Sequence, residues 1–464
     1  MHDILIETAE APTPIQALFE EGFAALDDAY VAALAESVRF KAKRGEVLLV
    51  PGADGRLARV LFGLGKAGPV DPMAVRPLPG RLPAGDYVLT GPEDGSLDPR
   101  HAALAWALGS YAFDRYRKRD DRPRARLVAS DTPALDEIRH VAAACSLARD
   151  LVNTPAADMG PLQLETVARE IAEAHSATLT VTTGEALLEN GYPAVHAVGR
   201  AAAPHRAPRI IELNWNAERT DLPLVALVGK GVVFDSGGLD IKPASGMRQM
   251  KKDMGGAAHT LALGRMVMQA GLPLRLVVLV PAVENAISGD AFRPGDILQS
   301  RKGLTIEIGN TDAEGRLILA DALARASEHG PELTVDFATL TGAARVALGP
   351  ELPPFYTADE ALAADIAEAA VAEGDPVWRM PLWPGYRDAI DSELADVRND
   401  SADWAQAGSV TAALFLQKFA PEAGAWVHFD IFAWNPRGRA GWPAGAEAQA
   451  IRAVYAVLKK RYGG

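Results

Sequence analysis

The stretch LTIEIGNTDAEGRLILAD, residues 304–321, contains the features that decide how this chain folds. The alternation in LTIEIG is typical of a β-strand, and the apolar spacing after the charged turn is typical of a helix that ends at the following HGP. Between the two, Asp312, Glu314 and Arg316 place charge where both flanks are built to be buried. Such charge is costly unless it is paired or coordinated, so the turn requires partners from elsewhere in the sequence.

Short apolar runs alternate with helical patterns along the chain, which favours the α/β class. Strands are predicted at 46–50, 58–63, 222–229, 274–283, 333–340 and 425–434. Helices are predicted at 101–116, 160–175, 256–270, 317–329 and 408–419. The later strands are almost continuously apolar, as expected for strands covered on both faces. We therefore expect a central mixed β-sheet sandwiched by helices, with functional loops at the strand ends.

The length of 464 residues favours two domains. Residues 117–133 are charged and contain prolines, and we predict that they are the linker ending a smaller N-terminal α/β domain, residues 1–133. Residues 134–464 are expected to form the larger domain. The pattern GLGKAG at 63–68 fits a dinucleotide-binding turn, but the prolines after it are incompatible with the helix that such a site requires. An ordinary turn is expected there.

The composition argues against several classes of protein. The net charge of −13 disfavours nucleic-acid binding, because such proteins are usually basic. The most apolar stretch, 272–283, is broken by Arg275 and is shorter than the ~20 residues that span a bilayer. The first residues lack the positive and apolar regions of a signal peptide. We expect a cytoplasmic protein without a membrane partner, whose single cysteine, Cys145, is buried on a helix.

A second dense stretch of charge, residues 227–262, follows another predicted strand. It contains Lys230, Asp235, Lys242 and Asp253. Taken singly, each acid is more simply a turn or helix cap, and each cation a surface or ion-pairing charge. Together, however, the acids of the two stretches would repel each other in one crevice, and divalent cations would remove that repulsion. Both stretches precede helices too apolar to be exposed, which favours a metal site.

The residue types around this site restrict the choice of metal. No His or Cys alternates with the acids, so Mg²⁺, Mn²⁺, Zn²⁺ and Co²⁺ are the suitable ions. The absence of H-E-x-x-H excludes a single-zinc metalloprotease of that type. His259 lies in an apolar helix and His428 on an apolar strand, so both are expected to be structural rather than metal ligands.

The octapeptide NTDAEGRL, residues 310–317, resembles the signature of the leucyl aminopeptidases, the cytosol aminopeptidase family of di-metal exopeptidases. Further blocks occur in the family's order and spacing: DLVNTPAADM (150–159), VGKGVVFDSGG (228–238), IKP (241–243), KDMGGAA (252–258), VENAISGDAFRPGD (283–296) and DFATLTGAARVALG (336–349). The resemblance covers about residues 135–464. It implies that 134–464 are a catalytic di-metal aminopeptidase domain.

The resemblance also implies a role for each charged residue. Asp235 and Glu314 would bridge two divalent cations. Lys230 and Asp253 would complete the tighter site, and Asp312 would complete the exchangeable one. Manganese or zinc is expected in these sites, with cobalt or magnesium as alternatives. As a metal ligand the lysine must be neutral, so the metal has to displace its proton.

Further implications concern the reaction and its substrate. Lys242 would remain an ammonium facing the reaction centre, and Arg316 would hold a bicarbonate that helps to move protons. The first side chain of a peptide with a free N-terminus would enter an apolar slot near Met250, Thr339 and Gly342. The expected enzyme releases N-terminal, preferentially leucine-like residues through attack of metal-activated water on the first peptide bond. The resemblance further implies a homohexamer.

Two other functions remain open at this stage. Acid-rich di-metal sites with Lys and Arg also suit a metal-dependent phosphohydrolase, which would cleave p-nitrophenyl phosphate rather than leucine p-nitroanilide. Alternatively, the chain could be a DNA-binding protein that retains an aminopeptidase site. The intact set of acids and Lys242 argues against this alternative, in which the site is a relic. Salt-dependent binding to random duplex DNA would support the alternative.

Overall fold

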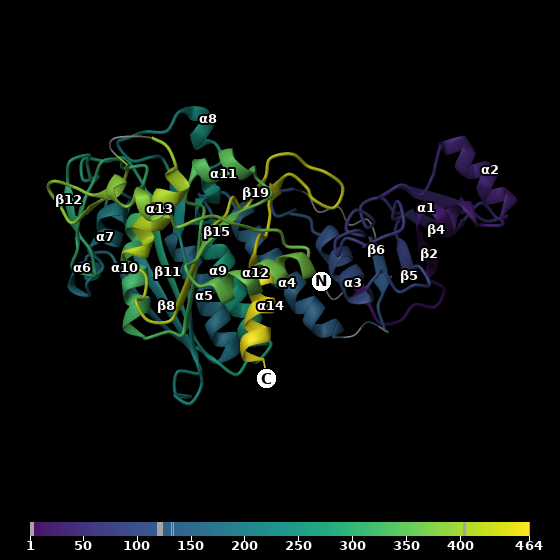
Figure 1. Ribbon diagram of the computed structural model, residues 1–464, viewed down its shortest axis with the longest axis horizontal. Coiled ribbons are helices and arrows are strands. Elements are labelled where there is room, and N and C mark those ends of the chain that lie inside the picture. The colour runs from purple at the N-terminus through teal and green to yellow at the C-terminus, as the bar shows by residue number, and fades with distance from the viewer. Residues whose placement is uncertain (1–3, 118–123, 131, 133, 402–404, 464) are drawn as a thin grey trace. The chain divides into compact units, whose positions relative to one another are not determined.

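The computed structural model describes residues 4–117, 124–130, 132, 134–401 and 405–463 (Figure 1). The chain divides into two compact units. Unit 1 comprises Met1–Ser146, Ala372–Gly374 and Pro436–Ala444, and unit 2 comprises Leu147–Val371, Asp375–Asn435 and Gly445–Gly464. The predicted linker, 117–133, lies partly outside the described residues. A domain boundary at residue 133 stays a prediction.

Unit 1 is built on a six-stranded sheet in the order β1-β6-β5-β2-β4-β3. Its strands are β1 (Leu5–Ile6), β2 (Thr13–Leu18), β3 (Val47–Pro51), β4 (Leu57–Gly63), β5 (Gly85–Thr90) and β6 (Ala125–Val128). All neighbouring strands are parallel except β3 and β4. The strands predicted at 46–50 and 58–63 are therefore confirmed, and the GLGKAG segment, which begins at the last residue of β4, forms a bend rather than a helix.

The helices of the first part of the chain are α1 (Glu20–Ala24), α2 (Ala29–Val38) and α3 (Pro99–Gly109). The predicted helix 101–116 was too long, because α3 ends at Gly109. The hydroxyl and amide of Ser110 both donate to the carbonyl of Trp106, at 2.9 and 3.0 Å. A serine that bonds back to the backbone in this way favours a helix end over a helix interior.

Unit 2 is built on a nine-stranded mixed sheet, which confirms the predicted fold class. Its strands run in the order β16-β15-β18-β14-β9-β11-β8-β7, with β10 pairing with β11. Their bounds are β7 (Thr178–Thr183), β8 (Arg209–Trp215), β9 (Leu224–Gly229), β10 (Gly231–Asp235), β11 (Arg275–Asn285), β14 (Leu333–Ala338), β15 (Pro354–Tyr356), β16 (Trp378–Arg379) and β18 (Ala425–Asp430). Strands β9, β10, β11, β14 and β18 form its parallel centre.

Besides the nine-stranded sheet, the described residues from 135 to 463 contain two small sheets and the remaining helices. The small sheets contain β12 (Ile297–Gln299), β13 (Thr305–Glu307) and β17 (Val397–Arg398), and β19 (Trp434–Asn435) with β20 (Gly445–Ala446). The helices are α4 (Leu135–Asn153), α5 (Pro161–His175), α6 (Ala186–Glu189), α7 (Pro193–Gly199), α8 (Ala244–Met247), α9 (Gly255–Gln269), α10 (Glu314–Glu328), α11 (Gly342–Leu348), α12 (Glu360–Ala372), α13 (Gly408–Gln417) and α14 (Ile451–Tyr462). The 3₁₀ helices are η1 (Pro204–Arg206), η2 (Met250–Met254), η3 (Pro384–Tyr386) and η4 (Asp388–Ile390).

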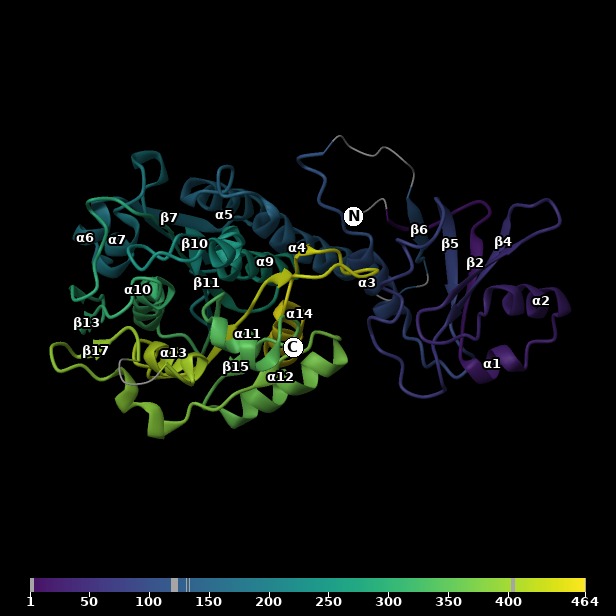
Figure 2. The ribbon, with the colours of Figure 1, turned by 90° about the horizontal axis from the view of Figure 1, so that it is seen from above.

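Helices cover both faces of the large sheet. On one face α5 and α9 pack against the strands and α14 packs on α9, while on the other face α7 and α10 pack against the strands and α13 packs on α10. Figures 1 and 2 show β11 between α9 and α10. Every residue of β9 and β14 is buried, because these strands are covered from both sides. The sandwich holds the loops at the strand ends in fixed positions.

One long predicted strand, 425–434, is only partly correct. Strand β18 ends at Asp430, and the chain then turns at Ala433, whose φ of 55° lies in the left-handed region. The amides of Phe432 and Ala433 both donate to Gln449 Oε1, at 3.1 and 2.8 Å. The Gln449 side chain thus accepts the hydrogen bonds that a neighbouring strand would otherwise accept. The predicted strand therefore ends before residue 434.

The remaining predicted elements agree with the structure within a few residues at their ends. Helix α10 begins at Glu314 rather than at residue 317, so the signature itself forms the first helical turn. None of the helices in the described ranges has the length and the apolar character needed to cross a membrane.

Candidate active site

The predicted site residues lie at the carboxyl ends of the parallel strands in unit 2. Lys230 directly follows β9, Asp235 is the last residue of β10, and Thr339 directly follows β14. The carboxyl ends of neighbouring parallel strands meet at one edge of a sheet, which is where open α/β sheets bind ligands. Residues from separate stretches of the sequence are therefore brought to one place.

Two helix starts supply the other acids. Glu314 is the first residue of α10 and Asp312 precedes it by two, while Asp253 lies in η2, directly before α9. Two glycines make this packing possible. A Cβ on Gly315 would lie 2.5 Å from Lys230 Cε, and a Cβ on Gly256 would lie 2.1 Å from the carbonyl oxygen of Phe337. A side chain at residue 315 would have to displace the Lys230 side chain, and one at residue 256 would collide with the backbone.

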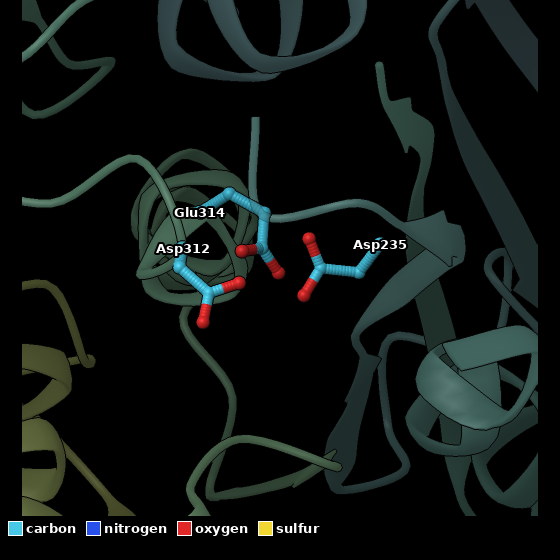
Figure 3. Close-up of side chains that lie close together, drawn as sticks. All are labelled: Asp235, Asp312 and Glu314. Carbon is cyan, nitrogen blue, oxygen red and sulfur yellow. The ribbon is translucent and has the colours of Figure 1, made fainter. Parts of the chain in front are cut away.

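The structure brings the carboxylates and lysines into one cluster. Carboxylate oxygens of Asp235, Asp312 and Glu314 lie within 4.8 Å of one another, and Figure 3 shows these side chains converging from separate segments. Lys230 Nζ lies 2.8 Å from Asp253 Oδ2 and 3.0 Å from Glu314 Oε1. The five predicted metal ligands are thus grouped together.

The chemistry of this cluster fits divalent cations. Among the described residues, Asp253 Oδ2, Asp312 Oδ1 and Glu314 Oε1 are buried without a hydrogen-bond partner of good geometry, although lysine ammonium groups lie close to all three. Buried carboxylate oxygens in this state are costly. Converging hard oxygen donors are what Mn²⁺, Mg²⁺ and Zn²⁺ bind.

Burial and mutual repulsion shift the pKa values of the acids. Burial, and then the charge of Asp235, raises the pKa of Glu314 to about 8 and that of Asp312 to about 6. Burial also acts to raise the pKa of Asp253, but the neighbouring Lys230 outweighs it and the pKa is lowered. Without cations the cluster therefore retains protons that ions would displace.

The two lysines of the cluster are both held as ammonium groups. Burial acts to lower the pKa of Lys230, but Asp253, Glu314 and Asp235 together outweigh it and raise the pKa. For Lys242, burial is likewise outweighed, chiefly by Asp235, and the pKa is raised. Lys242 Nζ lies 2.8 Å from Asp235 Oδ2 and also pairs with Asp312.

A cavity of about 530 Å³ opens beside the cluster. Met250, Thr339 and Gly342 line it, and so do Lys242 and Arg316. Arg316 is only 9% exposed, its Nη1 donates to the carbonyl of Asn399 at 2.6 Å, and its Nε has no partner among the described residues. All ten predicted site residues therefore lie at the cluster or on the walls of this cavity.

Two supporting residues were not predicted. Asn285, at the end of β11, donates from Nδ2 to Asp235 Oδ1 at 2.9 Å and to the carbonyl of Thr311 at 3.1 Å. Asp430, at the end of β18, accepts from the amides of Leu340 and Thr341 at 3.0 and 3.1 Å. Both end apolar strands of the parallel centre, and that position is the sequence signal that could have identified them.

Three residues predicted to be structural lie in the core. His259 is fully buried, with Nδ1 donating to the carbonyl of Gly255 at 2.6 Å and Nε2 accepting from the amide of Gln449 at 3.0 Å. His428 is fully buried beside Asp336, 2.5 Å from its carboxylate. Cys145 is buried on α4. Neither histidine belongs to the acidic cluster.

Comparison with known proteins gives a consistent result along the chain. The profile described as "Cytosol aminopeptidase family, catalytic domain" matches residues 146–455, and that of the "M17 aminopeptidase, N-terminal domain" matches residues 13–130. A probable cytosol aminopeptidase of Syntrophotalea carbinolica is 40% identical over 469 residues, covering 94% of this chain and 93% of the relative. One of Roseiflexus castenholzii is 41% identical over 368 residues, covering 76% and 74%.

Comparison with solved structures gives matches over almost the whole chain. The cytosol aminopeptidase of Coxiella burnetii superposes with a TM-score of 0.91 at 43% identity, covering 98% of both chains. The bottromycin maturation enzyme BotP in complex with Mn has a TM-score of 0.86 at 35% identity, covering 97% of this chain and 99% of that one. A variant of tomato leucine aminopeptidase has a TM-score of 0.85 at 28% identity, covering 98% and 96%.

These matches do not favour the phosphohydrolase or the DNA-binding alternative. They extend over both units and agree with the cluster of acids and lysines at the strand ends. The chain belongs to the cytosol aminopeptidase family, and it is a metal-dependent hydrolase that removes residues from the N-termini of peptides.

Proposed function

We propose that the enzyme binds two divalent cations through Lys230, Asp235, Asp253, Asp312 and Glu314, and that it prefers leucine-like first residues. The observation that carries the cation proposal is the convergence of three carboxylates within 4.8 Å, with Lys230 and Asp253 alongside. Manganese or zinc is proposed, with cobalt or magnesium as alternatives. The Mn complex of BotP supports manganese by analogy.

When bound, such cations lower the pKa of a water molecule towards neutrality and polarise the carbonyl under attack. The protein's own groups would supply the rest of the reaction. Lys242 reaches the cavity with an ammonium whose pKa is raised, so it stays charged and can donate to an oxygen that gains negative charge. Its two carboxylate partners fix its position before substrate arrives.

Arg316 is proposed to bind a small anion, bicarbonate, that helps to move protons. Its guanidinium lines the cavity, and among the described residues Nε has no hydrogen-bond partner while Nη1 is held by the carbonyl of Asn399. An anion could accept from the free donor and exchange protons with the leaving amine. Burial lowers the pKa of Arg316 from its usual range, but arginine remains charged near neutral pH.

The preference for leucine-like residues is supported by the cavity wall at Met250, Thr339 and Gly342. The surface that these residues leave is mainly apolar. Met250 contributes a thioether and Gly342 has no side chain, while the Thr339 hydroxyl is already bonded to Asp253 and leaves its methyl group to the cavity. An apolar pocket discriminates by only about 1–3 kcal/mol per methylene, so the preference should be broad.

The single most informative experiment removes and restores the metal. The protein is treated with a chelator, dialysed, and assayed on leucine p-nitroanilide after separate addition of Mn²⁺, Zn²⁺, Co²⁺ and Mg²⁺. Loss of hydrolysis on chelation and recovery with one or two of these ions is expected. Full activity of protein stripped of divalent ions would contradict the proposal, and turnover of p-nitrophenyl phosphate alone would contradict the substrate class.

We further propose that the protein acts in the cytoplasm as a homohexamer on peptides with a free N-terminus. The family's description as cytosol aminopeptidases supports the location, and the hexamer follows from the resemblance in sequence. Large apolar residues are exposed on unit 2, among them Ile241, Trp378 and Leu394. Exposed apolar surface is common where subunits meet.

A further inference from the structure

The cavity beside the cluster has a cationic wall that the proposed mechanism does not use. Lys252, Arg345 and Phe432 line the same cavity as Met250 and Thr339. Lys252 Nζ lies 5.2 Å from the centroid of the Phe432 ring, and Arg345 Cζ lies 4.6 Å from it. Two cations thus flank one aromatic side chain at the place where a substrate side chain is expected.

The amine of Lys252 has no hydrogen-bond acceptor among the described residues. Its residue is only 4% exposed, and the nearest carboxylate oxygen, Asp253 Oδ1, lies 3.8 Å from Nζ. That separation is too long for a hydrogen bond, and the oxygen already accepts from Thr339 Oγ at 2.8 Å. The amine therefore has no acceptor in the described part of the protein, and a ligand that enters the cavity with an acceptor can take its hydrogen bond.

Arg345 adds a second cation at an exposed position. It lies on α11, directly after the pocket residues Gly342–Ala344. Among the described residues no carboxylate lies within ion-pairing distance of its guanidinium, which instead packs over the Phe432 ring. Arg345 thus has no carboxylate partner in the described part of the chain, and the carboxylate nearest to Lys252, that of Asp253, is shared with Lys230.

The wall is held in a fixed conformation. Gln449 is 6% exposed, and its Oε1 accepts from the amides of Phe432 and Ala433 at 3.1 and 2.8 Å. Its Nε2 donates to the carbonyl of Pro350 at 2.8 Å. A turn fixed in this way keeps the Phe432 ring against the two cations, so the wall is preformed rather than built around a ligand.

We propose that Lys252 is a specificity-determining residue, which donates a hydrogen bond to the side chain of the substrate's first residue. Among longer first residues, those ending in an oxygen acceptor, glutamine and glutamate, are favoured over norleucine, which has a similar reach without the acceptor. The amine can donate whether or not it carries a charge. This inference rests on the proposed function. It adds a polar end to the apolar pocket formed by Met250, Thr339 and Gly342, which is proposed to receive leucine.

The test compares selectivity within each protein. Manganese-loaded wild type and variants are assayed with the 7-amido-4-methylcoumarin derivatives of glutamine, glutamate, norleucine and leucine. In wild type we expect kcat/KM for glutamine to exceed that for norleucine. In Lys252→Met the glutamine-to-norleucine ratio is expected to fall about tenfold, the effect of one hydrogen bond. In Arg345→Met the ratio of kcat/KM for glutamate to that for glutamine is expected to fall, because the cavity wall loses a positive charge.

Lys251→Met is the matched control. The neighbouring Lys251 amine donates to the carbonyl of Asn153 at 2.5 Å, and its residue is not part of the cavity wall, so the ratio should stay at the wild-type value. Lys252→Gln keeps a donor and should retain part of the preference. It also serves if Lys252→Met does not fold, which its melting temperature would reveal.

The outcomes separate the two proposals. A wild-type ratio below one, an unchanged ratio in a folded Lys252→Met, or an equal loss in Lys252→Gln and Lys252→Met would overturn the specificity role. Wild-type protein that hydrolyses none of the four substrates with any of the four metals would overturn the proposed function instead. Hydrolysis of leucine together with a ratio that depends on residue 252 supports both.

Discussion

At the scale of single residues, Lys242 is the group on which the proposed reaction depends most directly. Replacing it by alanine removes a donor to the developing negative charge, which is commonly worth about 3–4 kcal/mol. We predict that Lys242→Ala lowers kcat/KM for leucine p-nitroanilide by at least about 100-fold. Circular dichroism of the manganese-loaded variant should stay close to wild type, because bound cations would balance the charge of Asp235 and Asp312, the two partners of Lys242.

The control for this prediction is Lys251→Ala, which removes a lysine of η2 that does not line the cavity. Its kcat/KM should remain within a few-fold of wild type. If Lys242→Ala were as active as this control, the proposed role of the ammonium would be wrong.

Metal binding should depend steeply on pH. Burial and the charge of Asp235 raise the pKa of Glu314 to about 8 and that of Asp312 to about 6, so protons compete with cations for these oxygens below those values. Lys230 must also lose a proton to act as a ligand. Affinity for Mn²⁺ is therefore expected to rise with pH between 6 and 8, with protons released on binding.

Titration calorimetry at pH 6.5 and 8.0, in buffers of different ionisation enthalpy, measures both the affinity and the number of protons released. An affinity that is independent of pH, with no buffer dependence of the heat, would contradict the assignment of these residues as ligands. Glu185→Gln is a suitable control, because this exposed acid pairs with His196 rather than with the cluster.

At the scale of secondary-structure elements, the first turn of α10 can approach Lys230 only because residue 315 is glycine. A Cβ there would lie 2.5 Å from Lys230 Cε, so Gly315→Ala must displace the lysine. Overpacking of this kind costs about 1–3 kcal/mol, which exceeds the ~1 kcal/mol that alanine gains over glycine in a helix. We predict lower stability to denaturant and an at least tenfold weaker affinity for Mn²⁺.

Gly289→Ala is the matched control for this substitution, because nothing lies within 4 Å of the Cβ that it would add. Its stability and Mn²⁺ affinity should match wild type. Equal behaviour of the two variants would show that α10 and Lys230 are not closely packed.

The carboxyl end of β18 should control the turn that forms one wall of the cavity. Asp430 accepts hydrogen bonds from the amides of Leu340 and Thr341 and from Thr341 Oγ, the last at 2.6 Å. Asp430→Ala leaves these donors without their acceptor, which should cost about 1–3 kcal/mol and raise KM through disorder of the wall. Urea denaturation and steady-state kinetics measure the two effects.

Asp359→Ala provides a comparison outside the site. Asp359 Oδ1 accepts from the amide of Leu362 in the first turn of α12, so its loss should cost about 1 kcal/mol and leave KM unchanged. An unchanged KM in Asp430→Ala as well would mean that the turn is held by other contacts.

Much of this architecture could be predicted because its signals are local. Continuous apolar runs predicted the buried strands of the central sheet. Charge after predicted strands made Lys230, Asp312 and Glu314 candidate site residues, and their proposed roles came from the resemblance. The turn at Ala433 could not be predicted, because it depends on Gln449 from a separate segment. Asn285 was missed for a similar reason, since its amide matters only once β10 and β11 lie side by side.

At the scale of the whole molecule, assembly can be measured directly. If the proposed homohexamer forms, sedimentation velocity should give a particle of about six times the 49.2 kDa chain mass over a wide range of protein concentration. Particles of about 50 kDa alone would exclude it for this protein. Intermediate masses that change with concentration would indicate a weaker assembly than the one proposed.

The composition of unit 1 bears on the order in which the chain becomes structured during synthesis. Arg76 is 2% exposed, its Nε donates to the carbonyl of Gly441 at 2.9 Å, and its guanidinium lies 4.5 Å from the Trp442 ring centroid. Gly441 is synthesised 365 residues after Arg76. The amino-terminal unit therefore cannot finish folding until that distant segment has been made, and a fragment that stops at residue 146 should leave the Arg76 environment open to solvent and proteases.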